Sequence, residues 1–148
     1  MLKQIKSDGS GGLTLGRRDL HCGDVLQVLI PTLSEGAELV TCLLYTSGCI
    51  LLYKGHRTLI AAPDGRLYRN HSGNPGMAKG GSGDVLAGML VSLCGQGLDP
   101  VDAACAAAWL HGRAGDMAAN ARSEYGMTPG DLLHFLPDLL KRYNTREW

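Results

Sequence analysis

A glycine-rich run that leads directly into an apolar helical pattern constrains this chain more than any other feature. Residues 74–88 read Asn-Pro-Gly-Met-Ala-Lys-Gly-Gly-Ser-Gly-Asp-Val-Leu-Ala-Gly. Gly80, Gly81 and Gly83 lack a Cβ, so the main chain there can come close to a ligand. The N–H groups and the positive dipole end of the following helix favour a phosphate at the same place. The run therefore predicts an anion-binding loop, with a purely structural helix start as the alternative.

Asp84 adds a carboxylate to this predicted anion site. A carboxylate repels a phosphate, so its position suggests either a metal between the two groups or a base that takes a proton from an attacking hydroxyl. A first-turn acid that merely complements the helix dipole is the alternative. The run matches neither the P-loop pattern nor the G-x-G-x-x-G dinucleotide fingerprint. Its spacing alone does not assign a reaction.

A second polar cluster follows Cys49–Tyr53, a continuous apolar run that is typical of a strand buried on both faces. Open α/β sheets bind ligands at the carboxyl ends of their strands, so this cluster is a candidate for a nucleotide phosphate or base. A polar hairpin loop is the alternative. The cluster consists of Lys54, Gly55, His56, Arg57 and Thr58.

The remaining patterns predict an α/β domain in which helices pack on a sheet. Residues 25–30 and 58–62 read as strands, with 66–70 as a hairpin partner after a turn at 63–65. One helix follows the glycine-rich run as far as Gly95, and its apolar residues recur at helical spacing.

Weaker patterns complete the prediction of secondary structure. Asp99 and Thr128 read as N-caps of two more helices, one extending to about Ala121 and one to Tyr143. Pro137 is expected to bend or divide the last helix. A short helix is expected within 33–44, and residues 1–24 read as a tail or loop.

Composition excludes several classes of protein. Lysine and arginine together number 14 and so do aspartate and glutamate, which leaves no electrostatic footprint for nucleic acid or an anionic membrane surface. The apolar stretches are shorter than the roughly 20 residues of a membrane span. The 5 cysteines form no C-x-x-C pair, which argues against a zinc site or a disulfide framework and favours a cytoplasmic setting. His111 is expected to be a satisfied buried histidine, and Cys94 and Cys105 to be packing residues.

From about Cys49 to Tyr143 the chain resembles the ADP-dependent NAD(P)H-hydrate dehydratases, which form the carbohydrate-kinase-related domain of the YjeF-type repair proteins in the ribokinase-like superfamily. The glycine-rich run with its preceding Gly73 carries the resemblance. Three segments in matching order support it, namely Lys54–Thr58, Leu110–Gly112 with Ala114–Asp116, and Asp131–Leu133 with Leu136-Pro137.

The resemblance implies a three-layer α/β/α fold, of which residues 49–144 would be the C-terminal part of a truncated domain. Residues 1–48 would be an unassigned segment without family resemblance, and 145–148 a tail. An exposed edge strand in such a part would favour a homo-oligomer.

The resemblance also implies a reaction: NADH or NADPH is restored from its C6-hydrated form, with ADP or ATP as phosphoryl donor and Mg²⁺ at the phosphates. Asp84 would then bind the hydrated substrate and act as the catalytic base. The N–H groups of Gly81, Ser82 and Gly83 would form the anion hole. Lys54, Gly55, His56, Arg57 and Thr58, together with Gly83, would hold the nucleotide, and no side-chain metal ligands are expected.

One departure and two alternatives accompany this resemblance. Lys79 stands where the family usually has a small or hydroxyl residue, so its charge is expected either to reach the phosphates or to disturb the loop. A ribokinase-like kinase for a hydroxymethylpyrimidine or a thiazole alcohol would share the glycine-rich loop and the aspartate. An inactive nucleotide-binding fragment would share the fold without the turnover.

Overall fold

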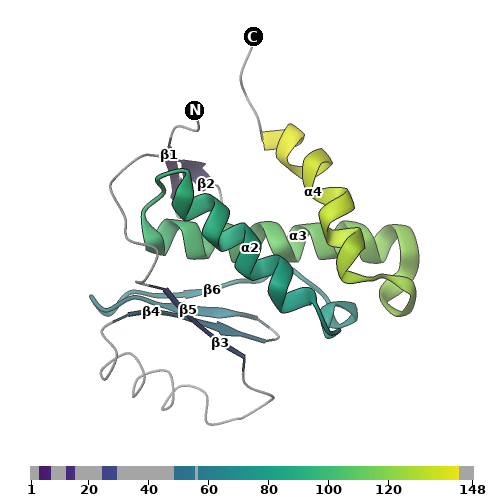
Figure 1. The fold of residues 1–148 in the computed structure, drawn as a ribbon, viewed down its shortest axis with the longest axis horizontal. Helices are drawn as coiled ribbons and strands as arrows, with labels where there is room; N and C mark the ends of the chain where they lie inside the picture. Colours follow the sequence, from purple (N-terminus) through teal and green to yellow (C-terminus); the bar gives the residue numbers. More distant parts are fainter. Residues whose placement is uncertain (1–3, 8–12, 16–24, 30–48, 56, 144–148) are drawn as a thin grey trace.

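A mixed four-stranded sheet lies beneath three helices in the computed structural model, which describes residues 4–7, 13–15, 25–29, 49–55 and 57–143 (Figure 1). The strands lie in the order β3-β4-β5-β6. Their bounds are Val25–Leu29 for β3, Ile50–Lys54 for β4, Leu59–Ala61 for β5 and Leu67–Arg69 for β6.

Strand β4 is central to the sheet because it pairs on both sides. It runs parallel to β3, with Leu29 opposite Lys54, and antiparallel to β5, with Leu52 opposite Ile60. Leu51 and Leu52 are 1% and 0% exposed, so neighbouring residues that point to opposite faces are both buried. This confirms the prediction of a strand buried on both faces.

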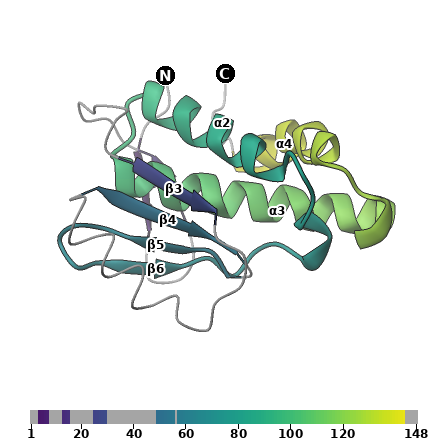
Figure 2. The same cartoon turned by 60° about the horizontal axis from the view of Figure 1, so that its bottom comes forward.

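The helices follow the sheet in sequence and lie on one of its faces (Figure 2). Helix α2 spans Ser82–Gly95, α3 spans Pro100–Gly126 and α4 spans Pro129–Tyr143. The Asp99 side chain caps α3 as predicted, since its Oδ1 accepts a hydrogen bond from the Val101 N–H at 3.1 Å. Thr128 precedes α4, and the Asp131 carboxylate accepts from its N–H at 2.7 Å. This hydrogen bond lowers the pKa of Asp131.

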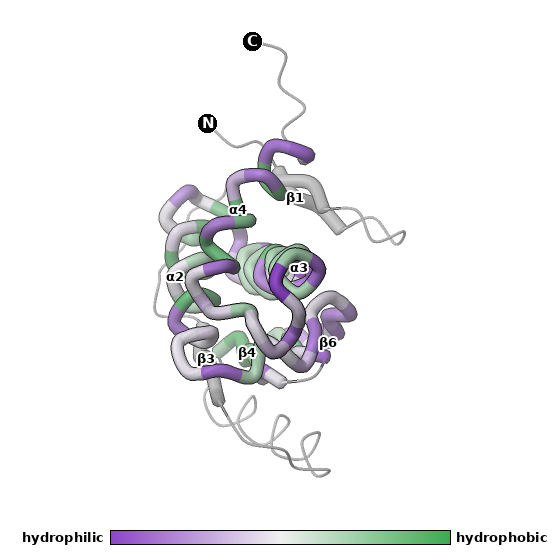
Figure 3. The backbone as a smooth tube through the Cα atoms, turned by 90° about the vertical axis from the view of Figure 1, so that its right-hand side faces the viewer, coloured by the Kyte–Doolittle hydropathy of each residue, from purple (hydrophilic) through white to green (hydrophobic). Residues whose placement is uncertain are grey.

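Helix α3 forms the centre of the core. Figure 3 views it end-on, between α2 and α4 on one side and the sheet on the other. Its alanines permit this close packing, and Ala103, Ala104, Ala106 and Ala107 are each 0% exposed. Larger side chains from α2 and the sheet, such as Leu86 and Leu52, complete the same cluster.

Strand β3, the hairpin of β5 and β6, and the three helices confirm the predicted α/β class. One expectation was wrong, and one of two alternatives was excluded. Gln4–Ser7 (β1) and Leu13–Leu15 (β2) pair as antiparallel strands rather than forming a tail, because the apolar-polar alternation at 13–15 suits a strand. Of the two effects expected of Pro137, division of the helix does not occur, because α4 continues through it. Pro137 is exposed, so water can reach the Leu133 carbonyl that lacks its usual N–H partner.

Two further points concern the extent of the helices. The short helix expected within 33–44 falls outside the described residues. Helix α3 reaches Gly126, beyond the expected end near Ala121, although Ser123 leaves helical geometry with φ 66°. None of the helices in the described ranges is long and apolar enough to cross a membrane.

Candidate active site

An open cleft of about 520 Å³ lies between the carboxyl end of β4 and the N-terminus of α2. Four of the residues predicted to bind the nucleotide or the substrate line it, namely Lys54, Gly81, Gly83 and Asp84. Four others complete the lining: Ala78, Lys79, Gly80 and Ala87. Two segments that are separate in the sequence are therefore brought to one site, at the sheet edge where open α/β folds bind ligands.

Strand geometry places Lys54 in this cleft. Side chains alternate along a strand, so Lys54 shares a face with Ile50 and Leu52, which contribute to the core beneath the helices. Lys54 is the last residue of β4 and lies where that core ends and the cleft begins. Partial burial lowers the pKa of its ammonium group, because the charged form loses hydration.

The glycine-rich loop turns through a short 3₁₀ helix, Pro75–Met77 (η1), before α2 begins. Gly81 precedes α2 with φ 91°, in the left-handed region that glycine adopts at low cost. The Gly81 carbonyl accepts hydrogen bonds from the N–H groups of Asp84 and Val85 at 3.1 and 3.2 Å. The Ser82 N–H donates to the Lys79 carbonyl at 3.2 Å, so this member of the expected anion hole already has a partner.

Ser82 is the first residue of α2 and is 1% exposed. Its carbonyl lies 2.8 Å from Nε2 of His111 on α3, and its Oγ lies 3.2 Å from the same nitrogen. Burial and, to a smaller extent, the charge of Lys54 lower the pKa of His111 to about 4, although the hydrogen bond to the Ser82 carbonyl opposes the shift. His111 is thus a neutral, satisfied histidine that fixes the start of α2, as the sequence predicted.

This buried histidine predicts a loss of stability in mild acid. The unfolded chain binds a proton near the ordinary pKa of 6.5 and the folded chain only near 4, so stability is complete above 6.5 and falls as the pH drops toward 4. Between pH 7 and 5.5 the contribution of His111 to the free energy of unfolding falls by about 1 kcal/mol. Urea titrations of wild type and His111→Gln at pH 7 and at pH 5.5 measure this fall in the free energy of unfolding. The decline should shrink in His111→Gln and persist in the exposed control His71→Gln; equal declines in all three proteins would contradict the assignment.

The segment after β4 contributes less to the cleft than the sequence suggested. Lys54 lines it, whereas Thr58 is 8% exposed and its Oγ1 donates to the Gly55 carbonyl at 3.2 Å, which closes the turn. Arg57 has φ 61°, an uncommon conformation for a residue with a side chain, and is exposed together with Gly55. His56 lies outside the described residues.

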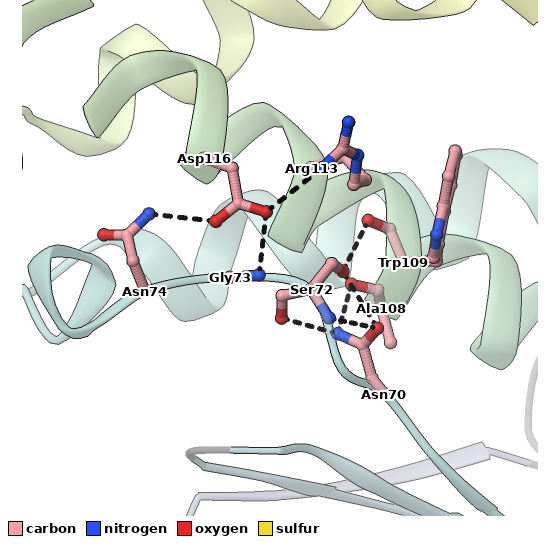
Figure 4. A network of polar contacts seen from close by, with 8 residues as sticks. All are labelled: Asn70, Ser72, Gly73, Asn74, Ala108, Trp109, Arg113 and Asp116. Atoms are coloured by element: carbon pink, nitrogen blue, oxygen red, sulfur yellow. Dashed lines mark hydrogen bonds and ion pairs between the residues drawn. The ribbon is translucent and has the colours of Figure 1, made fainter. Parts of the chain in front are cut away.

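The chain that leads into the glycine-rich loop is held on α3 by polar contacts (Figure 4). Asn70 Nδ2 donates to the Ala108 carbonyl at 3.0 Å, and Ser72 Oγ donates to the Trp109 carbonyl at 3.1 Å. About two turns further along α3, the Asp116 carboxylate accepts from the Gly73 N–H at 3.2 Å and from Asn74 Nδ2 at 3.3 Å. These contacts fix the direction from which the loop enters the site.

The described residues give little support to two other kinds of chemistry, a metal centre made of side chains and a reactive cysteine. Within the described ranges, no group of three or more His, Cys, Asp or Glu side chains could hold a metal ion. The expected Mg²⁺ would therefore need phosphate oxygens among its ligands, because the described side chains do not supply a complete set. Burial raises the pKa of the Cys105 thiol to about 12, which keeps it protonated and unreactive, in agreement with its prediction as a packing residue.

Comparison with known proteins assigns the family. Residues 22–138 match the NAD(P)H-hydrate dehydratase family. The chain belongs to this family. The match confirms the resemblance seen in the sequence and reaches into the segment before residue 49. The bifunctional NAD(P)H-hydrate repair enzyme of Moorella thermoacetica is 58% identical over 92 residues, which are 62% of this chain and 17% of that enzyme. The ADP-dependent (S)-NAD(P)H-hydrate dehydratase of Neisseria meningitidis is 54% identical over 70 residues, 47% of this chain and 24% of that one.

Solved structures extend the similarity to the fold. The ADP/ATP-dependent NAD(P)H-hydrate dehydratase of Bacillus subtilis, co-crystallized with ATP/Mg²⁺ and soaked with CoA, superimposes with a TM-score of 0.73 at 26% identity, over 97% of this chain and 53% of that chain. A ribokinase-like superfamily protein of Enterococcus faecalis gives a TM-score of 0.64 at 29% identity, over 82% of this chain and 45% of that chain. This dehydratase-family chain thus has a ribokinase-like α/β fold and spans about half of the solved relatives.

Lys79 is the site residue whose role the sequence did not reveal. Its position in the glycine-rich run indicated a charge that reaches the phosphates or disturbs the loop. In the structure it lines the cleft, but its ammonium points to backbone carbonyls after the end of the regular part of α3. Those carbonyls lie more than 40 residues away in the sequence, and no local pattern marks them as partners.

Proposed function

We propose that this chain carries the nucleotide-dependent dehydratase site that restores NADH or NADPH from its hydrated form. The observation that supports the proposal is the convergence of Lys54, the glycine-rich loop and Asp84 on one cleft. ADP or ATP would bind with its phosphates at the N-terminus of α2, where the helix dipole and the Lys54 ammonium both favour negative charge. A cytoplasmic location, where nicotinamide nucleotides are used, agrees with this role.

Asp84 would act on the hydroxyl at C6 of the hydrated ring. Its exposed carboxylate in the first turn of α2 would take the hydroxyl proton while the oxygen attacks the terminal phosphorus of ADP. The phosphorus–oxygen bond to AMP breaks, and AMP leaves with the electron pair. The C6–O bond then breaks with phosphate as the leaving group, and loss of a proton from the neighbouring carbon completes the ring double bond. Phosphate leaves far more readily than hydroxide, which is why the reaction needs a nucleotide.

The other residues of the cleft would position the reactants and offset their charge. Lys54 would neutralise phosphate oxygens, and main-chain N–H groups around Gly81 and Gly83 would donate to the phosphoryl group in transfer. Mg²⁺, when bound to the phosphates, supplies further charge neutralisation. The Gly55–Thr58 turn, adjacent to Lys54, would contact the nucleotide beyond its phosphates.

Turnover with hydrated NADH tests this function directly. The protein is incubated with hydrated NADH, Mg²⁺ and ADP, and the appearance of the NADH absorbance band is followed together with AMP and phosphate. We expect equal amounts of NADH, AMP and phosphate, and no NADH when ADP is omitted. Thermal stabilisation by ADP without NADH formation, while the Bacillus subtilis enzyme is active in parallel, would instead identify a nucleotide-binding protein without this activity.

A further inference from the structure

The glycine-rich loop is attached to a part of the chain far from it in sequence. The Lys79 ammonium donates to the backbone carbonyls of Glu124, Tyr125 and Met127 at 3.1, 2.9 and 2.5 Å. An ammonium group has three N–H donors, so these bonds use all of them. Lys79 immediately precedes the Gly80-Gly81 pair, and its partners belong to the junction between α3 and α4, residues 123–129.

Two glycines place the loop against the same junction. A Cβ on Gly76 would lie 2.6 Å from the Glu124 carbonyl oxygen and 2.7 Å from the Glu124 Cα, so only glycine permits this approach. A Cβ on Gly81 would lie 3.4 Å from Cγ of Pro129, the first residue of α4. The loop therefore contacts the α3–α4 junction before, at and after Lys79.

The local geometry explains why a cation suits this position. Helix α3 loses regular geometry at Ser123, and the carbonyls that follow have no further helical turn to supply their N–H partners. Carbonyls at a helix C-terminus carry partial negative charge and favour a cation. Because these carbonyls hold the Lys79 ammonium, the positive charge of Lys79 is directed away from the phosphates. Of the two lysines that line the cleft, Lys54 is the one whose ammonium group remains to bind them.

We propose that Lys79 is a positioning residue for the nucleotide site: it fastens the glycine-rich loop to the α3–α4 junction and thereby holds the main-chain N–H groups of the loop in place for the phosphates. The inference rests on the proposed function for its link to ADP, while the attachment itself is a property of the free protein. Lys79 acts through the loop and does not touch the nucleotide.

Hydrogen exchange of the free chain, residues 1–148, tests the attachment without any nucleotide. In Lys79→Met, which keeps the length of the side chain but loses its donors, amides in residues 80–84 and 124–127 should both exchange about tenfold faster. Lys79→Arg retains a cation with several donors and should exchange close to wild type. Lys141→Met removes an exposed lysine of α4 and should change neither segment. Ile60→Val, a change in the buried β5, controls for a general loss of stability.

Binding of ADP, measured by calorimetry on the same variants, tests whether the attachment of the loop positions the nucleotide site. Lys79→Met should weaken ADP about tenfold, and Lys79→Arg should restore most of the affinity. Faster exchange confined to 80–84 and 124–127, with weaker ADP binding, supports the proposal. Unchanged exchange in Lys79→Met overturns it, and if ADP alone is then weakened, Lys79 contacts the phosphate directly. Failure of wild type to bind ADP overturns the proposed function, whereas the exchange data still decide whether Lys79 fastens the loop.

Discussion

Replacing Asp84 with asparagine is expected to lower the rate of nucleotide-dependent dehydration by about 10²–10⁴-fold. Asparagine has nearly the same shape but cannot accept the proton of the substrate hydroxyl, so the attack on phosphorus loses its base. Asp84 is exposed at the cleft, in the first turn of α2, where a substrate hydroxyl could reach it. The turnover number for hydrated NADH with saturating ADP, measured for both proteins, gives the effect.

Nucleotide affinity separates this role from a structural one. The loss of a negative charge beside the phosphates should leave ADP binding unchanged or slightly tighter, so the Asp84→Asn defect should lie in turnover and not in the KM for ADP. Asp138→Asn is the matched control, because Asp138 is an exposed carboxylate on α4. Turnover by Asp84→Asn within a few-fold of wild type would remove Asp84 from the proposed mechanism. A parallel loss of ADP binding would make it a residue that shapes the loop.

The sequence predicted the elements whose signals are local. The apolar run at 49–53, the turn at 63–65, the Asp99 cap and the glycine-rich run before α2 each depend on a few consecutive residues, and each was found where expected. The position of Lys54 directly after the apolar run also placed it at the carboxyl end of a strand, where open α/β sheets bind ligands. This convergence of the strand end and the helix start is the part of the site that sequence alone could supply.

The parts that could not be predicted depend on contacts between distant residues. The partners of Lys79 are backbone carbonyls, which every residue has, so nothing in the sequence around 124–127 distinguishes them. The Ser82 N–H, expected in the anion hole, instead donates to a carbonyl within its own turn. Pro137 was expected to bend or divide α4, and it does not divide it, because exposure of that turn to water reduces the cost of the missing hydrogen bond. In each case the outcome was decided by solvent or by a neighbour that the local sequence does not reveal.

Gly112→Ala is expected to destabilise the fold by about 2–3 kcal/mol, at the upper end of the range for overpacking. Gly112 is a buried position of α3, where alanine would otherwise favour the helix. Its Cβ would lie 2.2 Å from Ser72 Oγ and 2.6 Å from the Ser72 carbonyl carbon. The hydroxyl cannot turn aside freely, because its single proton is directed toward two acceptors, Asn70 Oδ1 at 2.9 Å and the Trp109 carbonyl at 3.1 Å. The backbone of Ser72 would have to move, and the start of the glycine-rich loop would move with it.

Gly88→Ala is the matched comparison, since it makes the same substitution within α2 at an exposed glycine whose Cβ would meet nothing within 4 Å. At Gly88 the added Cβ causes no clash, so only the higher helix propensity of alanine over glycine acts. The free energy of unfolding should therefore rise by about 0.5–1 kcal/mol. Urea titrations of both variants and of wild type measure these changes in the free energy of unfolding, which should fall in Gly112→Ala and rise in Gly88→Ala. Because Gly112→Ala displaces the chain that leads into the loop, it should also weaken ADP binding, which Gly88→Ala should leave intact. A stabilising Gly112→Ala would mean that α3 and residues 70–74 are not packed as closely as the structure shows, and the contacts from α3 could then not position the site.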